Sequence, residues 1–263
     1  MAGPTTAERG ARPRLKSGRP SQEPPSRRLR LPGRRQMIVL VGAVVVLAGG
    51  LWVLYGSNWL RAERVSTSGT AVLTRGEVEA AAAVPVGAPL ISVDTDAIER
   101  RLLRRLPRID SVDVVRSWPH GIDLKVVERI PVLLIEKDAK FIEMDGAGQR
   151  FATVDTAPRG VPLLRLSADR SASLRRFGTD RLAREAVRVR SGLPGKVAQD
   201  TRVIEVRSYD SISLELSGGR TVMWGSAEGG AAKARALTAL MKAAPGAAHF
   251  DVSAPTAPAV SGS

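Results

Sequence analysis

Residues 109–129 read IDSVDVVRSWPHGIDLKVVER, two runs of alternating apolar and polar residues on either side of the turn sequence WPHG. Alternation with a period of two is typical of strands that bury one face, and Pro and Gly between two such runs indicate a turn. One register places the apolar residues of both runs on a common face, whereas a shift by one residue would separate them. The stretch therefore predicts an antiparallel hairpin. The expected pairs are Val112 with Val126, Asp113 with Lys125, and Val114 with Leu124.

Upstream of this hairpin, the sequence predicts one more strand and two helices. Residues 64–68 form a short strand candidate that ends at Gly69. Thr74 and Glu77 form a capping box, which predicts a helix through Ala83. Asp94 is an N-cap for a second helix, whose apolar residues share one face and which stops before Pro107. The first domain, residues 61–130, therefore has the expected order β-α-α-β-β.

The C-terminal half is rich in strand candidates, so the expected fold class is α+β. β-branched or alternating runs bounded by turn residues predict its strands, and two one-sided apolar stripes predict its helices. This second domain is expected over residues 131–253, and residues 254–263, rich in Pro, Ala and Ser, are expected to be flexible. The expected strands are 132–137, 140–144, 203–208, 211–216, 220–224 and 248–252, and the expected helices are 180–191 and 229–242.

Residues 37–55 read MIVLVGAVVVLAGGLWVLY, and no charged residue occurs between Arg35 and Arg61. At 1.5 Å per residue these residues form roughly 28 Å of helix, close to the hydrocarbon thickness of a bilayer. A cleaved signal peptide has a shorter apolar region followed by a small-x-small site, which does not fit here. The sequence therefore predicts one transmembrane helix within residues 36–60. Aromatic rings suited to the membrane interface lie at Trp52, Tyr55 and Trp59.

The chain of 263 residues has a formal net charge of +14, and this charge is unevenly distributed. Residues 1–35 hold ten basic residues, two acidic residues and six prolines, a composition that predicts a disordered tail. The positive-inside rule places this tail in the cytoplasm and residues 61–263 outside the membrane. The expected partner of the tail is anionic lipid rather than nucleic acid, because the tail adjoins the anchor.

Motifs for catalysis and metal binding are missing from the sequence. The chain has no cysteine and two histidines, His120 and His249, which are far apart in the sequence. No phosphate-binding loop, dinucleotide fingerprint, nucleophile elbow or zinc-protease motif occurs. Asp145-Gly146-Ala147-Gly148 has a single carboxylate in ligand spacing, so a hairpin turn is expected instead of a calcium loop. We therefore expect no catalytic residue, cofactor or metal, and a site built from paired carboxylates stays open.

The order and spacing of several short motifs resemble the FtsQ/DivIB family of cell-division proteins, in an actinobacterial form. The motifs of the first domain resemble the POTRA-type domain of that family and its junction with the β domain. The motifs of the second domain resemble the β domain of the family. In the first domain they are Val65-x-x-x-Gly69, Gly87-x-Pro89-Leu90, Val93-Asp94, Leu106-Pro107, Val114-x-Arg116-x-Trp118-Pro119 and Glu128-Arg129-x-Pro131. In the second they are Asp145-x-x-Gly148-x-x-Phe151, Gly225 with Lys233 eight residues later, and Phe250-Asp251-Val252.

This resemblance implies a non-enzymatic, single-pass protein of the division septum. It would bind FtsB- and FtsL-type proteins and, through them, help to control the FtsW and FtsI peptidoglycan synthases. In the family the partner adds a strand near the C-terminus of the β domain, and the matching partner-binding residues are Phe250, Asp251, Val252, Ser253, Ala254, Pro255, Ala259 and Val260. A core role is the alternative for Phe250 and Val252. The residues expected to be architectural are Arg116, Trp118, Pro119, Glu128, Arg129, Pro131, Gly225 and Lys233.

Two other function classes stay open from the sequence alone. A membrane-anchored POTRA chaperone or secretion component would need an outer-membrane barrel as its partner and usually has repeated POTRA units, of which one is visible. A cell-wall enzyme would release or join peptidoglycan fragments.

Overall fold

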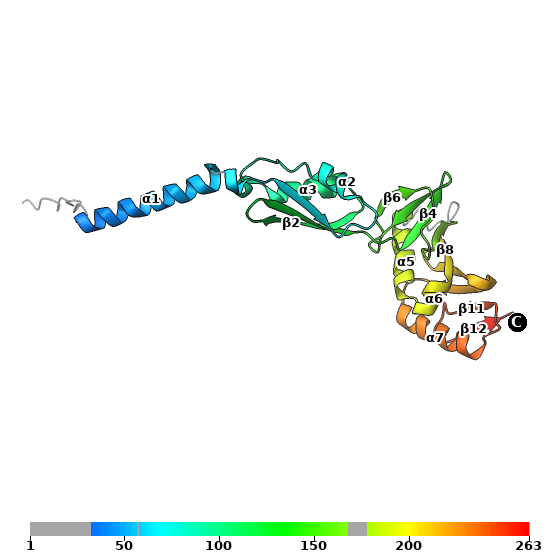
Figure 1. Cartoon of the computed structure of the whole chain (residues 1–263). Coiled ribbons are helices and arrows are strands. Elements are labelled where there is room, and N and C mark those ends of the chain that lie inside the picture. Colours follow the sequence, from blue (N-terminus) through cyan, green and yellow to red (C-terminus); the bar gives the residue numbers. More distant parts are fainter. Residues whose placement is uncertain (1–32, 57, 168–177, 263) are drawn as a thin grey trace, which may run out of the picture. The chain divides into compact units, whose positions relative to one another are not determined.

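The computed structural model describes residues 33–56, 58–167 and 178–262 (Figure 1). The predicted disordered tail falls almost wholly on residues 1–32, which lie outside the described part. The chain divides into two compact units, Met1–Gly50 and Leu51–Ser263.

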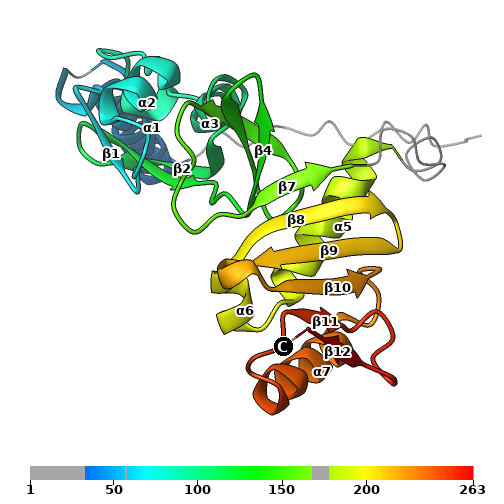
Figure 2. The same ribbon diagram turned by 90° about the vertical axis from the view of Figure 1, so that its right-hand side faces the viewer.

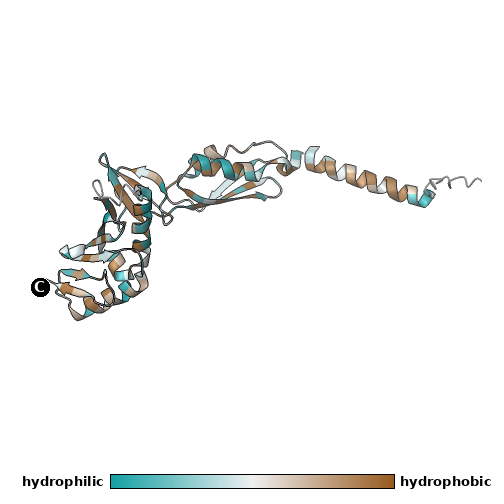
Figure 3. Cartoon of the chain, turned by 180° about the vertical axis from the view of Figure 1, so that it is seen from behind, coloured by the Kyte–Doolittle hydropathy of each residue, from teal (hydrophilic) through white to brown (hydrophobic). Residues whose placement is uncertain are grey.

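The helix α1 (Arg34–Gly56) contains the apolar run 37–55 and ends four residues before the predicted end of the membrane segment at residue 60. Apolar residues occur all around it, so the helix is predominantly brown in Figure 3, and none of its residues is buried. Of the described helices, it is the one long and apolar enough to cross a membrane. A helix that is apolar on every side is suited to lipid rather than to the surface of a soluble domain. A short 3₁₀ helix, η1 (Asn58–Leu60), follows it.

The first domain has the expected order β-α-α-β-β. It consists of β1 (Arg64–Ser68), α2 (Arg75–Ala82), the 3₁₀ helix η2 (Leu90–Ser92), α3 (Thr95–Arg105), β2 (Ile109–Ser117) and β3 (Gly121–Glu128). Its sheet has the order β1-β3-β2, with β1 parallel to β3. Both predicted caps form, because Thr74 and Glu77 make the full capping box and Asp94 accepts a hydrogen bond from the Ala97 N–H.

The hairpin of β2 and β3 has the predicted register. Val112 pairs with Val126, Asp113 with Lys125, and Val114 with Leu124. Val114, Ile122, Leu124 and Val126 are all buried, together with Ile98 and Leu102 of α3. The apolar faces of both strands thus meet α2 and α3 in one core, as the alternation requires.

The second domain is built on one sheet of nine strands in the order β12-β11-β10-β9-β8-β7-β4-β5-β6. Its helices α5, α6 and α7 lie against one face of this sheet (Figure 2). The strands are β4 (Leu133–Lys137), β5 (Lys140–Met144), β6 (Arg150–Val154), β7 (Leu163–Leu166), β8 (Thr201–Ser208), β9 (Ser211–Leu216), β10 (Thr221–Gly225), β11 (His249–Asp251) and β12 (Ala259–Ser261). The helices are α5 (Thr179–Gly192), α6 (Gly195–Asp200), the 3₁₀ helix η3 (Ser217–Gly219) and α7 (Gly230–Ala243).

Alternation along the strands separates the core from the open face of this sheet. In β9 every second residue is buried, namely Ile212, Leu214 and Leu216. These side chains pack with Trp224, which is fully buried, and with the inner faces of the helices. The other face of β8 to β12 is polar, so the second domain buries one face of its sheet in this region.

Four elements of the second domain were not predicted from the sequence: β6, β7, α6 and β12. The last of these overturns the expectation that residues 254–263 are flexible throughout, because Ala259, Val260 and Ser261 pair with β11. Three residues carry too short an alternation to indicate a strand by themselves. The exposed edge of β11 supplies the hydrogen-bond partners that hold β12 in place.

Candidate functional site

The strand β12 lies at one end of the nine-stranded sheet and pairs antiparallel with β11. In this register Ala259 pairs with Asp251, Val260 with Phe250, and Ser261 with His249. Among the described residues, no strand lies on its other side. An edge of this kind presents backbone N–H and C=O groups to any chain that approaches in extended form.

The hydrogen-bond pattern shows which backbone groups of β12 point outward. The Thr221 N–H donates to the Ala248 carbonyl at 2.8 Å and the Val252 N–H donates to the Met223 carbonyl at 2.9 Å, so the backbone groups of Phe250, which lies between them, face β10. Those of His249 and Asp251 therefore face β12, where these residues pair with Ser261 and Ala259. The N–H and C=O groups of Val260 consequently face away from β11. This edge thus offers one donor and one acceptor at Val260.

The two prolines near β12 precede its paired residues. Pro255 and Pro258 both belong to the segment that joins β11 to β12. Pro258 shares the outward parity of Val260, so a donor is missing from the outer edge at that position. Val260 is the first residue with an outward N–H.

The candidate residues of the C-terminal segment divide into core and surface. Phe250 and Val252 are buried against the helices, which agrees with the alternative left open by the sequence. The carboxylate of Asp251 accepts hydrogen bonds from the Ser253 N–H at 2.9 Å and from its hydroxyl at 2.7 Å, which fixes the turn after β11. Ala254 and Pro255 continue the connecting segment, and Ala259 and Val260 are exposed in β12. Ser261, absent from the sequence-based candidates, shares the edge with them.

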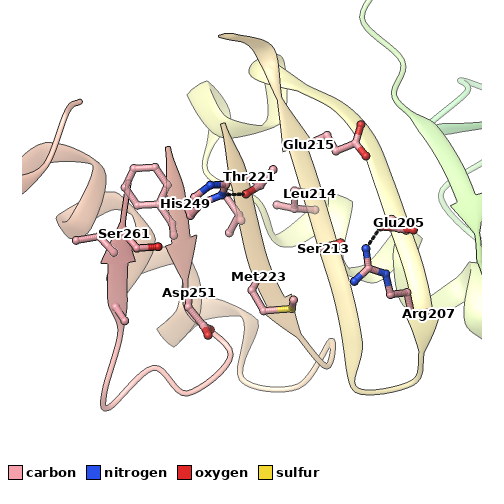
Figure 4. A pocket seen from close by; sticks show the side chains of 14 residues that line it. Glu205, Arg207, Ser213, Leu214, Glu215, Thr221, Met223, His249, Asp251 and Ser261 are labelled. Carbon is pink, nitrogen blue, oxygen red and sulfur yellow. Dashed lines mark hydrogen bonds and ion pairs between the residues drawn. The ribbon is translucent and has the colours of Figure 1, made fainter. Parts of the chain in front are cut away.

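A shallow hollow of about 490 Å³ lies on the polar face of the sheet next to this edge (Figure 4). Its floor consists of outward side chains from β8 to β12. The hydroxyl of Thr221 and Nδ1 of His249 lie 2.6 Å apart across β10 and β11. The labelled side chains that line it are Glu205, Arg207, Ser213, Leu214, Glu215, Thr221, Met223, His249, Asp251 and Ser261.

Charged groups on this face are held in opposite-sign pairs. Partial burial by itself raises the pKa of the Glu205 carboxyl, but hydrogen bonds from Ser167 and Arg207 and the positive charges of Arg207 and Arg165 bring that pKa below its ordinary value. Arg165 in turn pairs with Glu215 at 2.8 Å. The face is therefore polar and close to charge-balanced, and the described residues contain no cluster of three His, Cys, Asp or Glu side chains able to hold a metal ion.

The architectural candidates of the first domain lie at its two ends. Arg116 donates to the carbonyls of Leu90 at 3.1 Å and Val93 at 2.7 Å, and so fastens the η2 segment to the sheet. Trp118 and Pro119 form the turn of the hairpin, and Trp118 is 49% exposed. At the far end of β3, the Glu128 carboxylate accepts hydrogen bonds from three successive backbone N–H groups, those of Ala71, Val72 and Leu73.

Arg129 joins the two domains. Its guanidinium binds Asp145 at 2.6 Å, Asp110 at 2.9 Å and the Pro107 carbonyl at 3.1 Å. Arg108 makes a second bridge, to Glu143 at 2.6 Å, and lies over the Phe151 ring. Glu143 of β5 and Asp145, which directly follows β5, are both buried, so each carboxylate needs its arginine. Pro131 follows Arg129 in the short connection to β4.

Gly225 and Lys233 hold the turn between β10 and α7. Gly225 has a φ of +79°, and a Cβ there would lie 3.0 Å from the Ser253 Cβ. Lys233 is 3% exposed and donates to the Ser226 carbonyl at 2.8 Å. Desolvation lowers the pKa of its amine, and the nearby Glu228 carboxylate partly opposes that effect. Both residues thus lie at the turn between β10 and α7, and their architectural role stays a prediction.

Known proteins resemble this chain along its whole length. The family description "POTRA domain, FtsQ-type" matches residues 60–129, from the last residue of η1 to the end of the first domain. A protein named cell division protein FtsQ from Streptomyces venezuelae is 64% identical over 269 residues, covering 100% of this chain and 99% of its own. The chain belongs to the FtsQ/DivIB family of cell-division proteins.

Further relatives of this FtsQ-family chain include the cell division protein FtsQ of Streptomyces coelicolor, 65% identical over 268 residues and covering all of both chains. Among solved structures, the major extracytoplasmic domain of the cell division protein DivIB from Geobacillus stearothermophilus is 18% identical. That match has a TM-score of 0.33 and covers 44% of this chain and 93% of the other. The FtsQ relatives confirm the family expected from the sequence motifs, and the strands and helices of the two domains confirm the expected α+β fold class.

Proposed function

We propose that this FtsQ-family chain is a non-enzymatic scaffold of the division septum, which captures a small membrane-anchored division protein by strand addition at β12. The observation that supports this role is the open edge of β12, with the N–H and C=O groups of Val260 directed outward. An extended partner segment pairs with these groups and becomes the tenth strand of the sheet. The expected partners are of the FtsB and FtsL type.

The rest of the chain supplies the location for this contact. α1 anchors the protein in the cell membrane, with the basic tail in the cytoplasm near anionic lipid and residues 61–263 outside. Capture of the partner brings it to the septal synthases FtsW and FtsI, which the scaffold thereby helps to regulate. No nucleic acid takes part, because the folded domains lie across the membrane from it.

The decisive test removes one outward donor while leaving β12 paired with β11. Val260→Pro deletes the outward N–H, whereas Val260→Thr retains it and is the matched control. Capture is measured in living cells from a photo-crosslinking residue at the exposed position 259 of the full-length chain, with the exposed turn position 138 as a negative site. Loss of one hydrogen bond, together with the obstruction by the ring, should lower capture by about tenfold or more.

Two outcomes would contradict the proposal. Undiminished capture by Val260→Pro would show that the partner does not pair with β12. Capture of a barrel or secretion protein in place of a small division protein would favour the chaperone class instead. The Val260→Thr variant separates either outcome from a general effect of changing the side chain.

A further inference from the structure

The end of the first domain that adjoins α1 exposes large apolar side chains. Trp59 is 68% exposed, Val86 66% and Trp118 49%. They belong to three different segments: η1, the loop before η2, and the turn between β2 and β3. Scattered single apolar residues on a surface are common, but three from separate segments at one end of a domain require an explanation.

Hydrogen bonds tie these three segments together directly after the helix. The Ala62 N–H donates to the Ala88 carbonyl at 2.9 Å, and the Gly87 N–H donates to the Ala62 carbonyl at 2.7 Å. The Glu63 N–H donates to the His120 carbonyl at 2.9 Å, and Nδ1 of His120 lies 3.1 Å from the Trp59 carbonyl. The loops that carry Val86 and Trp118 are thus fastened to the linker that leaves α1.

The length of this linker limits how far these loops can lie from the membrane. From Gly56, the last residue of α1, to Arg61 is five residues, which span at most about 17 Å even when fully extended. The guanidinium of Arg61 donates to the Gly87 carbonyl at 2.8 Å, so the Val86 loop lies beside that point. The turns of α1 nearest the linker expose Trp52 and Tyr55 as well.

We infer that this end of the first domain, with Trp118 and Val86, rests in the headgroup region of the bilayer. The inference rests on the proposed anchoring by α1 and extends the lipid contact of that helix onto the folded domain. Tryptophan prefers this region, because its ring is apolar and its N–H can bind water or a headgroup. A surface hollow beside the turn, lined in part by Arg64, Ser66 and His120, adds polar groups for a phosphate-bearing headgroup.

The test uses full-length protein in vesicles of phosphatidylcholine and phosphatidylglycerol. The chain has no cysteine, so single cysteines can be introduced and labelled with an environment-sensitive fluorophore. Val86→Cys reports on the proposed contact, and Val72→Cys is the matched control, because Val72 is 64% exposed in the loop at the other end of β1. Val46→Cys, inside α1, reports on insertion of the anchor. Quenching is measured with spin-labelled lipids.

The label at position 86 should shift to the blue and lose intensity with quenchers near the headgroups, whereas the label at position 72 should do neither. Trp118→Ser should reduce the quenching at position 86, and Trp118→Tyr should restore it. Equal quenching at both positions, or none at position 86 while position 46 is quenched, would overturn the inference alone. An unquenched label at position 46 would overturn the anchoring together with it, whereas strand capture at β12 is measured independently.

Discussion

At the scale of single residues, Glu128 holds the loop that leads from β1 into α2. Its carboxylate accepts hydrogen bonds from three consecutive N–H groups at 2.8–3.1 Å. A carboxylate surrounded by donors in this way organises the loop before the Thr74 cap, and removing it leaves those donors without their acceptor.

We expect Glu128→Ala to destabilise the first domain by about 1–3 kcal/mol, because the N–H groups of the loop lose their acceptor. Glu128→Gln retains one oxygen and should cost less. The loss in free energy of unfolding is measured by denaturant unfolding. Glu63→Ala is the control, because Glu63 is exposed and has no recorded side-chain hydrogen bond in the described structure. Equal midpoints for Glu128→Ala and Glu63→Ala would contradict the role assigned to Glu128.

Lys233 makes stability depend on pH in a predictable direction. Burial lowers the pKa of its amine below the ordinary 10.5, so the unfolded chain binds more protons than the folded chain just below that pH. The contribution of Lys233 to stability therefore rises with pH across that window. Lys233→Met removes this dependence. The unfolding midpoint of the unaltered protein, measured relative to that of the variant, should therefore increase between pH 7 and pH 10. A constant difference, like that expected for the exposed Lys242→Met, would show that burial does not lower this pKa.

At the scale of secondary-structure elements, the end of β10 depends on a residue without a side chain. Gly225 combines a left-handed φ with a close approach to Ser253, whereas Gly219 has a φ of +74° and open space around it. Gly225→Ala should therefore lower the free energy of unfolding more than Gly219→Ala does. The expected loss for Gly225→Ala is about 1–3 kcal/mol, from backbone strain and displacement of the turn after β11. Hydrogen exchange should be faster in residues 249–261 of the first variant. Equal costs for both variants would mean that the contact with Ser253 relaxes freely.

The elements that the sequence predicted well are those whose signal is local. The β2–β3 register follows from alternation on both strands. The helix caps at Thr74 and Asp94 are each specified by three or four adjacent residues. In contrast, β7 has only four residues and pairs in parallel with β8 across α5 and α6, so its partner is distant in the sequence. β12 has three residues and exists through its pairing with β11.

The candidate site shows the same division between local and non-local information. The resemblance indicated the segment that contains Ala259 and Val260, because family motifs are short and contiguous. Which backbone groups point outward depends on the register with β11, which no local pattern specifies. Ser261 was missed for this reason, and the outward parity of Pro258 could not be recognised. Arg108 was missed as well, because its partner Glu143 lies in the other domain.

At the scale of the whole molecule, the two folded domains are coupled through buried ion pairs. Arg129→Ala leaves Asp145 buried without its cation and should destabilise the protein by about 3–5 kcal/mol. Arg150→Ala breaks an exposed pair with Asp180 and should cost at most about 1 kcal/mol. Calorimetry of the two variants compares them directly, and separate melting of the domains is expected in the first. Similar losses in both would mean that the junction contributes no more than a surface ion pair.

The small size of the β12 edge has a consequence for how the septum assembles. One outward residue, Val260, supplies two hydrogen bonds, which at net values of about 0.5–1.5 kcal/mol each give roughly 1–3 kcal/mol before the entropy of association is subtracted. Such a bond is too weak to find its partner in free solution. Two chains confined to one membrane meet at a high effective concentration, so their anchors convert a fleeting contact into a lasting one. The lipid bilayer thereby acts as the tether that makes a three-residue strand sufficient, and the same edge released from its anchor should hardly bind.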